Sequence, residues 1–200
     1  MAGRVTATKP KNEACVYRLK VTLKRSKPPI WRRLEVRSDT TLEMLHNILQ
    51  IAMGWSNDHL HQFVIDDTYY SSPPPGYDDA DFYVDAEPGQ NFTLAQVAPV
   101  EKTKFIYEYD FGDGWEHQIL VEKIQPLEPG KDYPVCVTGK RACPPEDIGG
   151  IWGYDFFLQA IKDPKHPRRK RYIERFGDLT DYDPEAFDLD AVNDELKKIK

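Results

Sequence analysis

One stretch of eleven residues, from Tyr107 to His117, constrains the fold more than any other part of the chain. It contains four aromatic residues, four carboxylates and two glycines, and it lies between two runs, 104–109 and 115–124, that are rich in aromatic and β-branched residues. An Asp-Gly pair between two such runs is a strong hairpin signal, because glycine adopts positive φ without a steric penalty. The stretch therefore predicts a β-hairpin with a short polar tip.

Two registers of this hairpin are compatible with the sequence. A connection of five residues places Tyr109 opposite Trp115 and also places Tyr107 opposite His117. A two-residue turn would instead place Asp110 opposite His117, which is a carboxylate–imidazole couple. A slip of one residue moves a whole set of side chains to the other face, and cross-strand aromatic pairs contribute about 0.2–1 kcal/mol each. We therefore expect the first register, with His117 on the inner, aromatic face.

The chain before this hairpin predicts another hairpin followed by a helix. Residues 15–24 and 30–37 alternate apolar and polar side chains, as half-buried strands do. Thr40 and Glu43 have the spacing of a capping box, and Gly54 suits the end of the helix that they begin. The further elements expected are strands at 60–66 and 82–84, a helical turn at 93–97, an irregular proline-rich connection at 126–145, and helices at 154–162, 168–176 and 189–199. The pattern predicts an α+β fold with a mixed or mostly antiparallel sheet, opened by a β-hairpin-then-helix unit, with helices concentrated toward the carboxyl terminus.

Length and composition indicate a globular protein and argue against a membrane or secreted one. A chain of 200 residues with 40% hydrophobic residues can form one globular domain, which we place at 14–200 after a disordered basic leader at 1–13. No apolar run approaches the roughly 20 residues that span a bilayer, and the first residues lack a secretory signal. The three cysteines show no Cys-x-x-Cys spacing, which favours reduced thiols in a cytoplasmic protein over a zinc ribbon. We expect a cytoplasmic protein without a membrane partner.

Positive charge is concentrated at the start of the chain. Residues 1–37 hold 11 lysines and arginines against 2 acidic residues, whereas residues 38–161 hold 6 against 21. Strand alternation places one basic face on the first hairpin, with Arg18, Lys20, Lys24, Trp31, Arg33 and Arg37, and residues 168–171 add a second patch. Nucleic acid is the partner class that such a face would take, since clustered cations contact phosphates and tryptophan stacks on bases. The alternative is that acidic residues neutralise the basic face within the molecule.

A ligand-binding cleft is predicted where two glycine-containing loops meet. The candidate residues come from the hairpin tip and from the Pro-Pro-Glu-Asp-Ile-Gly-Gly segment at 144–150: Asp110, Asp113, Trp115, His117, Glu146 and Asp147. Carboxylates at the mouth of such a cleft would prefer a cationic or metal-bound ligand. The competing interpretation is that the glycines serve turns and the carboxylates accept backbone hydrogen bonds.

The histidines raise the alternative of a metal-dependent enzyme. His59, His61 and His117 are the candidate ligands, because imidazoles beside carboxylates hold divalent metals. No histidine pair has the spacing of a helical zinc site, and no serine or cysteine is marked as a nucleophile. No cofactor is predicted, a divalent metal is the one candidate, and we expect binding rather than catalysis.

Four blocks of the sequence together resemble the plasmid pRiA4b ORF-3-like family. The blocks are Pro29–Arg33, Leu45–His46 with Gly54–Trp55 and His59–His61, Tyr109–His117, and 144–150 with Gly153–Tyr154. The resemblance runs from about residue 16 to residue 196. The resemblance implies an uncharacterised protein with a loose association with plasmids or DNA transfer and a likeness to resolvases. Nothing in the chain resembles the active site of a serine recombinase, so the resemblance supports a binding module of unknown ligand.

Overall fold

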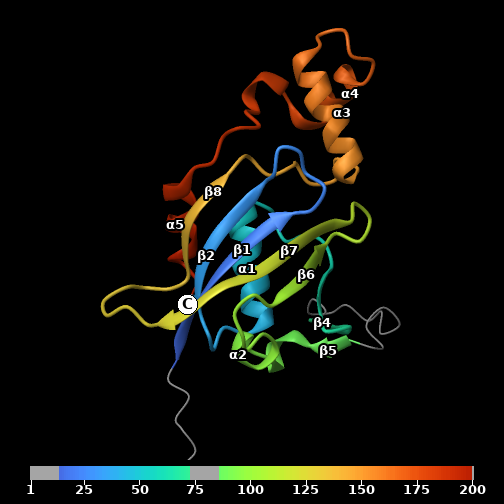
Figure 1. Ribbon diagram of the computed structural model, residues 1–200. Helices are drawn as coiled ribbons and strands as arrows, with labels where there is room; N and C mark the ends of the chain where they lie inside the picture. Colours follow the sequence, from blue (N-terminus) through green and yellow to red (C-terminus); the bar gives the residue numbers. More distant parts are fainter. Residues whose placement is uncertain (1–13, 73–85, 200) are drawn as a thin grey trace, which may run out of the picture.

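The computed structural model describes residues 14–72 and 86–199, and these residues form an eight-stranded sheet with helices around it (Figure 1). The leader expected at 1–13 and the strand expected at 82–84 lie outside the described residues. The strand order is β5-β4-β3-β6-β7-β1-β2-β8. All neighbouring strands are antiparallel except β4 and β5, which are parallel. The predicted α+β class with a mixed sheet is confirmed.

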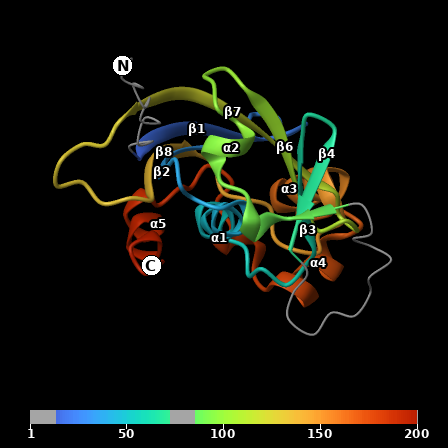
Figure 2. The same cartoon turned by 90° about the horizontal axis from the view of Figure 1, so that it is seen from below.

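The described part of the chain begins with a β-hairpin and a helix, continues through the remaining six strands with one short helix among them, and ends with three helices. The strands are β1 (Cys15–Leu23), β2 (Trp31–Arg37), β3 (His61–Ile65), β4 (Thr68–Ser71), β5 (Ala86–Pro88), β6 (Lys104–Tyr109), β7 (Trp115–Pro126) and β8 (Val135–Lys140). The helices are α1 (Leu42–Met53), α2 (Leu94–Val97), α3 (Gly150–Lys162), α4 (Arg169–Phe176) and α5 (Leu189–Leu196), with short 3-10 turns at Gly89–Asn91 and Leu179–Asp181. Figure 2 shows α1 and α5 on one side of the sheet. Of the helices described, none is long and apolar enough to cross a membrane.

The central hairpin adopts the predicted register. Tyr109 lies opposite Trp115, and Tyr107 lies opposite His117. The inward residues of β6 and β7 are almost completely buried and pack in the same core as Leu45 and Leu49 of α1. The alternation of apolar residues therefore determined the register, as expected where one face of a sheet is buried.

The structure differs from the predicted elements in several places, among them strands β4 and β5, which were not expected at 68–71 and 86–88. Helix α1 is capped by Thr41, whose side chain accepts a hydrogen bond from the amide of Met44, and not by Thr40. Strand β8 lies within the connection that we expected to be irregular, and it pairs with β2. Helix α3 begins at Gly150, four residues before the expected start at Tyr154. Local pattern did not reveal strand β8 or the start of α3, because each depends on a contact with a distant segment, β2 for the strand and Asp113 for the helix. By contrast, Gly54 ends α1 as predicted, and it has a left-handed conformation with φ of 85°.

A closed ring of hydrogen bonds joins α1 to the central hairpin and to the loop that follows α1. The amide of Asn57 donates to the Oε1 atom of Gln50 at 3.1 Å, and the Nε2 atom of Gln50 donates to the Tyr107 hydroxyl at 2.8 Å. The Tyr107 hydroxyl lies 2.8 Å from the Nδ1 atom of His46, whose Nε2 atom lies 2.6 Å from the Oδ1 atom of Asn57. The ring of His61 stacks on that of His46 with 3.4 Å between centroids. This ring of hydrogen bonds holds Asn57, which has a left-handed conformation with φ of 64° and lies in the loop that carries His59.

Three histidines are buried in the neutral form. Burial lowers the pKa of His46 to about 4 and that of His117 to about 4. Burial and the neighbouring His46 lower the pKa of His61 to about 2. Unfolded histidine has a pKa of about 6.5, so below that pH the unfolded chain binds protons that the folded protein does not. The stability that these rings contribute is full above about pH 6.5 and is lost as the pH falls.

We expect the free energy of unfolding to fall between about pH 6.5 and pH 4, with each buried histidine contributing up to about 1.4 kcal/mol per pH unit. The variant His117→Gln removes one of these titrations, so its stability should depend less steeply on pH in this window. Urea unfolding at several pH values measures the slope, and His166→Gln, at a half-buried surface histidine, controls for the loss of one imidazole. Equal slopes for wild type and His117→Gln would contradict the neutral burial of His117.

Candidate functional site

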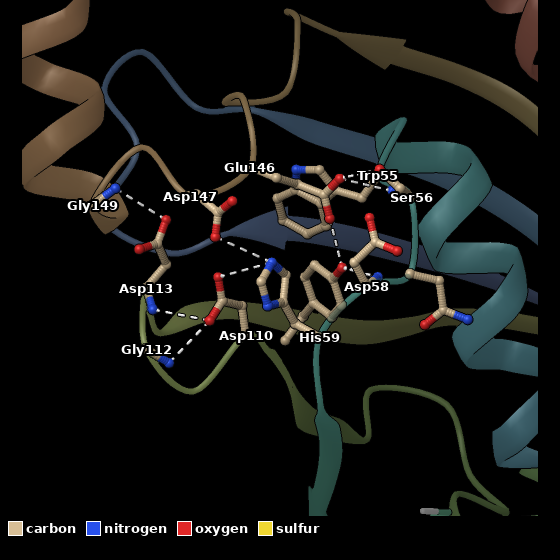
Figure 3. A network of polar contacts seen from close by, with 12 residues as sticks. Trp55, Ser56, Asp58, His59, Asp110, Gly112, Asp113, Glu146, Asp147 and Gly149 are labelled. Atoms are coloured by element: carbon tan, nitrogen blue, oxygen red, sulfur yellow. Dashed lines mark hydrogen bonds and ion pairs between the residues drawn. The ribbon is translucent and has the colours of Figure 1, made fainter. Parts of the chain in front are cut away.

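Three loops meet at one end of the sheet (Figure 3). They are the hairpin tip at 110–114, the loop at 55–60 after α1, and the turn at 144–149 before α3. The ring of His59 lies between the carboxylates of Asp110 and Asp147. The expected approach of the hairpin tip to the proline-rich turn beside a histidine is observed, and a binding role for this cluster stays a prediction.

The carboxylate of Asp110 is held from its own loop. Its Oδ1 atom accepts hydrogen bonds from the amides of Gly112 at 3.0 Å and Asp113 at 3.2 Å. Its own amide donates to the Leu60 carbonyl at 2.8 Å, which joins the tip to the loop after α1. The Oδ2 atom then lies 3.7 Å from the Nε2 atom of His59. Asp110 has φ of 54°, a left-handed conformation that aspartate tolerates better than most residues.

Asp147 approaches the same histidine from the opposite loop. Its Oδ1 atom lies 3.3 Å from the Nε2 atom of His59, and its Oδ2 atom lies 3.0 Å from a guanidinium nitrogen of Arg175 on α4. Asp147 also has φ of 54°. The half-exposed Asp147 carboxylate therefore connects the histidine to helix α4.

Glu146 has a different role from its neighbour. Its carboxylate accepts from the Tyr109 hydroxyl at 2.6 Å, from the Ser56 amide at 2.9 Å and from the Ser56 hydroxyl. Burial raises the pKa of Glu146, but the hydrogen bonds from Ser56 and Tyr109 outweigh this effect and hold the pKa below its usual range. Burial, together with the Glu146 carboxylate, raises the pKa of Tyr109 well above its ordinary value, so the hydroxyl remains a donor. With these partners, Glu146 fastens the loops together and is not directed at a ligand.

Asp113 fixes the start of α3 against the hairpin tip. Its Oδ2 atom accepts from the amide of Gly149 at 3.1 Å. Gly150 has φ of 64°, and a Cβ atom there would lie 2.3 Å from the backbone oxygen of Asp113. Only glycine fits this approach, which explains the second glycine of the Gly-Gly pair.

The three candidate metal ligands of the sequence analysis do not come together. Within the part of the chain that the structure describes, the one group that could share an ion is His59, Asp110 and Asp147, whose ligand atoms lie within 4.8 Å of one another. His61 points into the core from β3, and His117 is fully buried. His59 precedes β3, so strand alternation does not place its ring beside that of His61. The set His59, His61 and His117 is therefore corrected to His59, Asp110 and Asp147.

Trp115 and His117 do not line the cleft either. Both lie on the inner face of β7, where Trp115 is 1% and His117 is 0% exposed. Trp55 packs against both rings, with centroid distances of 5.9 Å to Trp115 and 5.3 Å to His117. In the observed register, the alternation of side chains along β7 places Trp115 and His117 on its buried face, away from the surface.

The basic face of the first hairpin is largely paired with acidic residues. Arg18 pairs with Glu35 of the adjacent strand at 2.6 Å. The other pairs are Arg33 with Glu122 at 2.7 Å, Arg37 with Asp39 at 2.7 Å, and Lys24 with Glu116. Lys20 and Arg33 lie over the ring of Trp31, at 5.2 and 5.3 Å from its centroid. These contacts support the alternative that the basic face is neutralised within the molecule, and nucleic-acid binding by it stays a prediction.

Sequence reasoning missed the residues that support the cluster. Tyr109 was expected only as a core aromatic, and Ser56 and Arg175 were not singled out. One signal could have identified Tyr109: it is an inward-facing tyrosine at the last position of a strand, and its hydroxyl needs a hydrogen-bond partner. The pairing of Arg175 with Asp147 depends on how α4 packs, and no local pattern reports that packing.

We expect Gly150→Ala to lower the free energy of unfolding by about 2–4 kcal/mol, because strain in φ adds to a clash with the Asp113 backbone. Gly130→Ala is the matched control, since Gly130 has φ of 79° but nothing within 4 Å of an added Cβ atom. The control should lose only about 1–2 kcal/mol. Denaturant unfolding of both variants measures the difference, and equal losses would contradict the close approach of the hairpin tip to α3.

Comparisons with known proteins agree with this architecture. The model of the family described as plasmid pRiA4b ORF-3-like protein matches residues 15–191. The uncharacterized protein y4hQ of Sinorhizobium fredii is 39% identical over 180 residues, which cover 90% of each chain. The crystal structure of a protein of unknown function, MM3350 from Methanosarcina mazei Go1, is 34% identical with a TM-score of 0.75, covering 89% of this chain and 96% of that one. The chain therefore belongs to the plasmid pRiA4b ORF-3-like family.

Proposed function

We propose that this protein is a binding module that holds a divalent cation with His59, Asp110 and Asp147. The observation that carries the proposal is the convergence of one imidazole nitrogen and two carboxylate oxygens from three different loops. Three segments must be folded and correctly joined before these atoms meet. The cation would then stabilise the same junction that creates its site.

The distances suit a shared ion. Ligand atoms about 2.0–2.2 Å from one metal, with angles of about 90–120° at it, lie about 2.8–3.8 Å apart. The Nε2 atom of His59 lies 3.3 Å from the Asp147 oxygen and 3.7 Å from the Asp110 oxygen. Small movements of the side chains would therefore complete the coordination.

The second layer of contacts orients the carboxylates. The Oδ1 atom of Asp110 is held by two amides, which leaves Oδ2 for the ion. The Oδ2 atom of Asp147 is held by Arg175, which leaves Oδ1. Such outer partners fix the direction of ligand atoms and support metal affinity.

The ligand types indicate which ions to test. One imidazole with two carboxylates suits Mn²⁺, Fe²⁺ and Zn²⁺ better than the all-oxygen sites of Ca²⁺ and Mg²⁺. Three protein ligands leave coordination positions for water or a bound ligand. Open positions are also what a metal-dependent enzyme requires. A hydrolytic enzyme is the second candidate function, favoured by the half-exposed position of Asp147 at the mouth of the site.

We expect wild-type protein to bind one Mn²⁺ or Zn²⁺ ion per chain, and Asp110→Asn and Asp147→Asn each to weaken binding by about 100-fold. Asparagine tolerates the left-handed backbone, so these variants remove the charge and retain the loop. Isothermal titration with each ion gives the stoichiometry and affinity, and thermal unfolding confirms that the variants fold.

The exposed residue Asp155 on α3, outside the cluster, supplies the control variant Asp155→Asn, which should bind the ion as wild type does. Failure of Mn²⁺, Fe²⁺ and Zn²⁺ to bind would refute the proposed function. Binding that survives both cluster substitutions would place the ion elsewhere.

A further inference from the structure

A pocket of about 330 Å³ lies directly beside the cation cluster. Its acidic wall is formed by Asp113 and Asp147, which also belong to the loops of the cluster. Its opposite wall carries three arginines at the start and along one side of α4, at positions 168, 171 and 175. Spacings of three and four residues bring side chains to the same face of a helix. The sequence places these arginines together, and the fold turns them toward the cluster.

We propose that this pocket binds the phosphate group of a small phosphorylated molecule, next to the divalent cation and with positive coupling to it. The inference rests on the proposed function, because the cation is what makes the pocket strongly attractive to an anion. The pocket volume falls within the range of small-molecule sites. Arginine suits phosphate because its planar fork donates two parallel hydrogen bonds to two oxygens.

The three arginines differ in how far other side chains already engage their guanidinium groups. The guanidinium of Arg168 lies over the ring of Phe156 at 4.1 Å, which restricts its plane. Arg175 is paired with Asp147 at 3.0 Å. Among the described residues, no carboxylate forms an ion pair with Arg171, so its donors are available to an incoming anion. Arg171 is therefore the residue on which anion binding should depend most.

The charges explain why cation and phosphate should bind together. Without an ion, the three guanidinium groups are partly offset by Asp113 and Asp147. A divalent cation on Asp147 cancels that negative charge and leaves an excess of positive charge in the pocket. It also lessens the attraction between Asp147 and Arg175, so that Arg175 can turn toward a phosphate oxygen. Coupling between two ligands is reciprocal, so phosphate must strengthen cation binding by the same factor.

A phosphate can come from a small molecule or from a nucleic-acid backbone. Trp152 of α3 is 72% exposed, and it would offer a stacking surface to a single strand. The size and concavity of the pocket favour the small molecule. The experiment therefore includes both sources.

The test is a titration of wild-type protein with inorganic phosphate, adenosine monophosphate and a twelve-nucleotide single strand of DNA. Each ligand is added once with saturating Mn²⁺ and once with EDTA. We expect phosphate and the mononucleotide to bind at least tenfold more tightly with Mn²⁺. Arg171→Gln should weaken this binding at least tenfold, and Arg171→Lys should give an intermediate loss because it retains the charge without the fork.

Lys170→Gln is the matched control, because the Lys170 side chain is 89% exposed, lies on the same helix and does not line the pocket. It should bind phosphate as wild type does. Mn²⁺ binding that persists in Arg171→Gln, together with lost phosphate binding, would support the pocket.

The outcomes separate this inference from the proposed function. Cation binding without phosphate binding in wild type would overturn the phosphate pocket and leave the cation site intact. Phosphate binding that is equal with Mn²⁺ and EDTA would overturn the coupling. Absence of Mn²⁺, Fe²⁺ and Zn²⁺ binding, both with and without phosphate, would refute the proposed function itself. Binding of the single strand alone would overturn the small-molecule assignment in favour of a nucleic-acid backbone.

Discussion

The carboxylate of Glu146 is the contact on which the geometry of the site depends. It accepts hydrogen bonds from Tyr109 at the end of β6 and from Ser56 in the loop after α1, while its own backbone belongs to the turn before α3. Three segments that are far apart in the sequence are thereby held at one point. Loss of such a carboxylate would leave the Tyr109 hydroxyl without its acceptor, at a cost of about 1–3 kcal/mol. Glu146, together with the Asp113–Gly149 hydrogen bond, holds the turn from which the neighbouring Asp147 faces His59.

Backbone strain is concentrated in the same place. Asp110 and Asp147 both have φ of 54°, and Gly149 and Gly150 have φ of 97° and 64°. A left-handed conformation costs roughly 1–2 kcal/mol for a residue with a Cβ atom and nothing for glycine, so surrounding contacts must offset the cost at the two aspartates. Here the amides of the hairpin tip, the Asp113–Gly149 hydrogen bond and the close packing of Gly150 supply those contacts. Strain of this kind at two facing carboxylates is consistent with a site that is shaped for binding.

Sequence reasoning succeeded where a pattern repeats locally and one face is buried. The alternation of aromatic residues determined the pairing of Tyr109 with Trp115, and the glycine after α1 correctly predicted its end. The meeting of the two glycine-containing loops was also predicted. The same reasoning could not decide which carboxylate faces His59, because Glu146 and Asp147 are adjacent in the sequence. Their roles differ only because Ser56 and Tyr109 bind Glu146. The sequence analysis wrongly placed His117 in a cleft. The burial of His117 depends on Trp55, which packs over it from another segment, and the strand pattern does not report that contact.

The hydrogen-bond ring through His46 runs in a single direction. Asn57 donates to Gln50, Gln50 to Tyr107, Tyr107 to His46 and His46 back to Asn57, so each member gives one hydrogen and receives one. This circular order specifies the tautomer of His46, with hydrogen on Nε2 and a lone pair on Nδ1. A second proton on His46 would occupy Nδ1, so the Tyr107 oxygen would face two donors, from Gln50 and from His46, while its own hydrogen would lose its acceptor. The cycle could then no longer close. The backbone of Asn57, and with it the loop that presents His59, is therefore anchored by an arrangement that has no room for an additional proton.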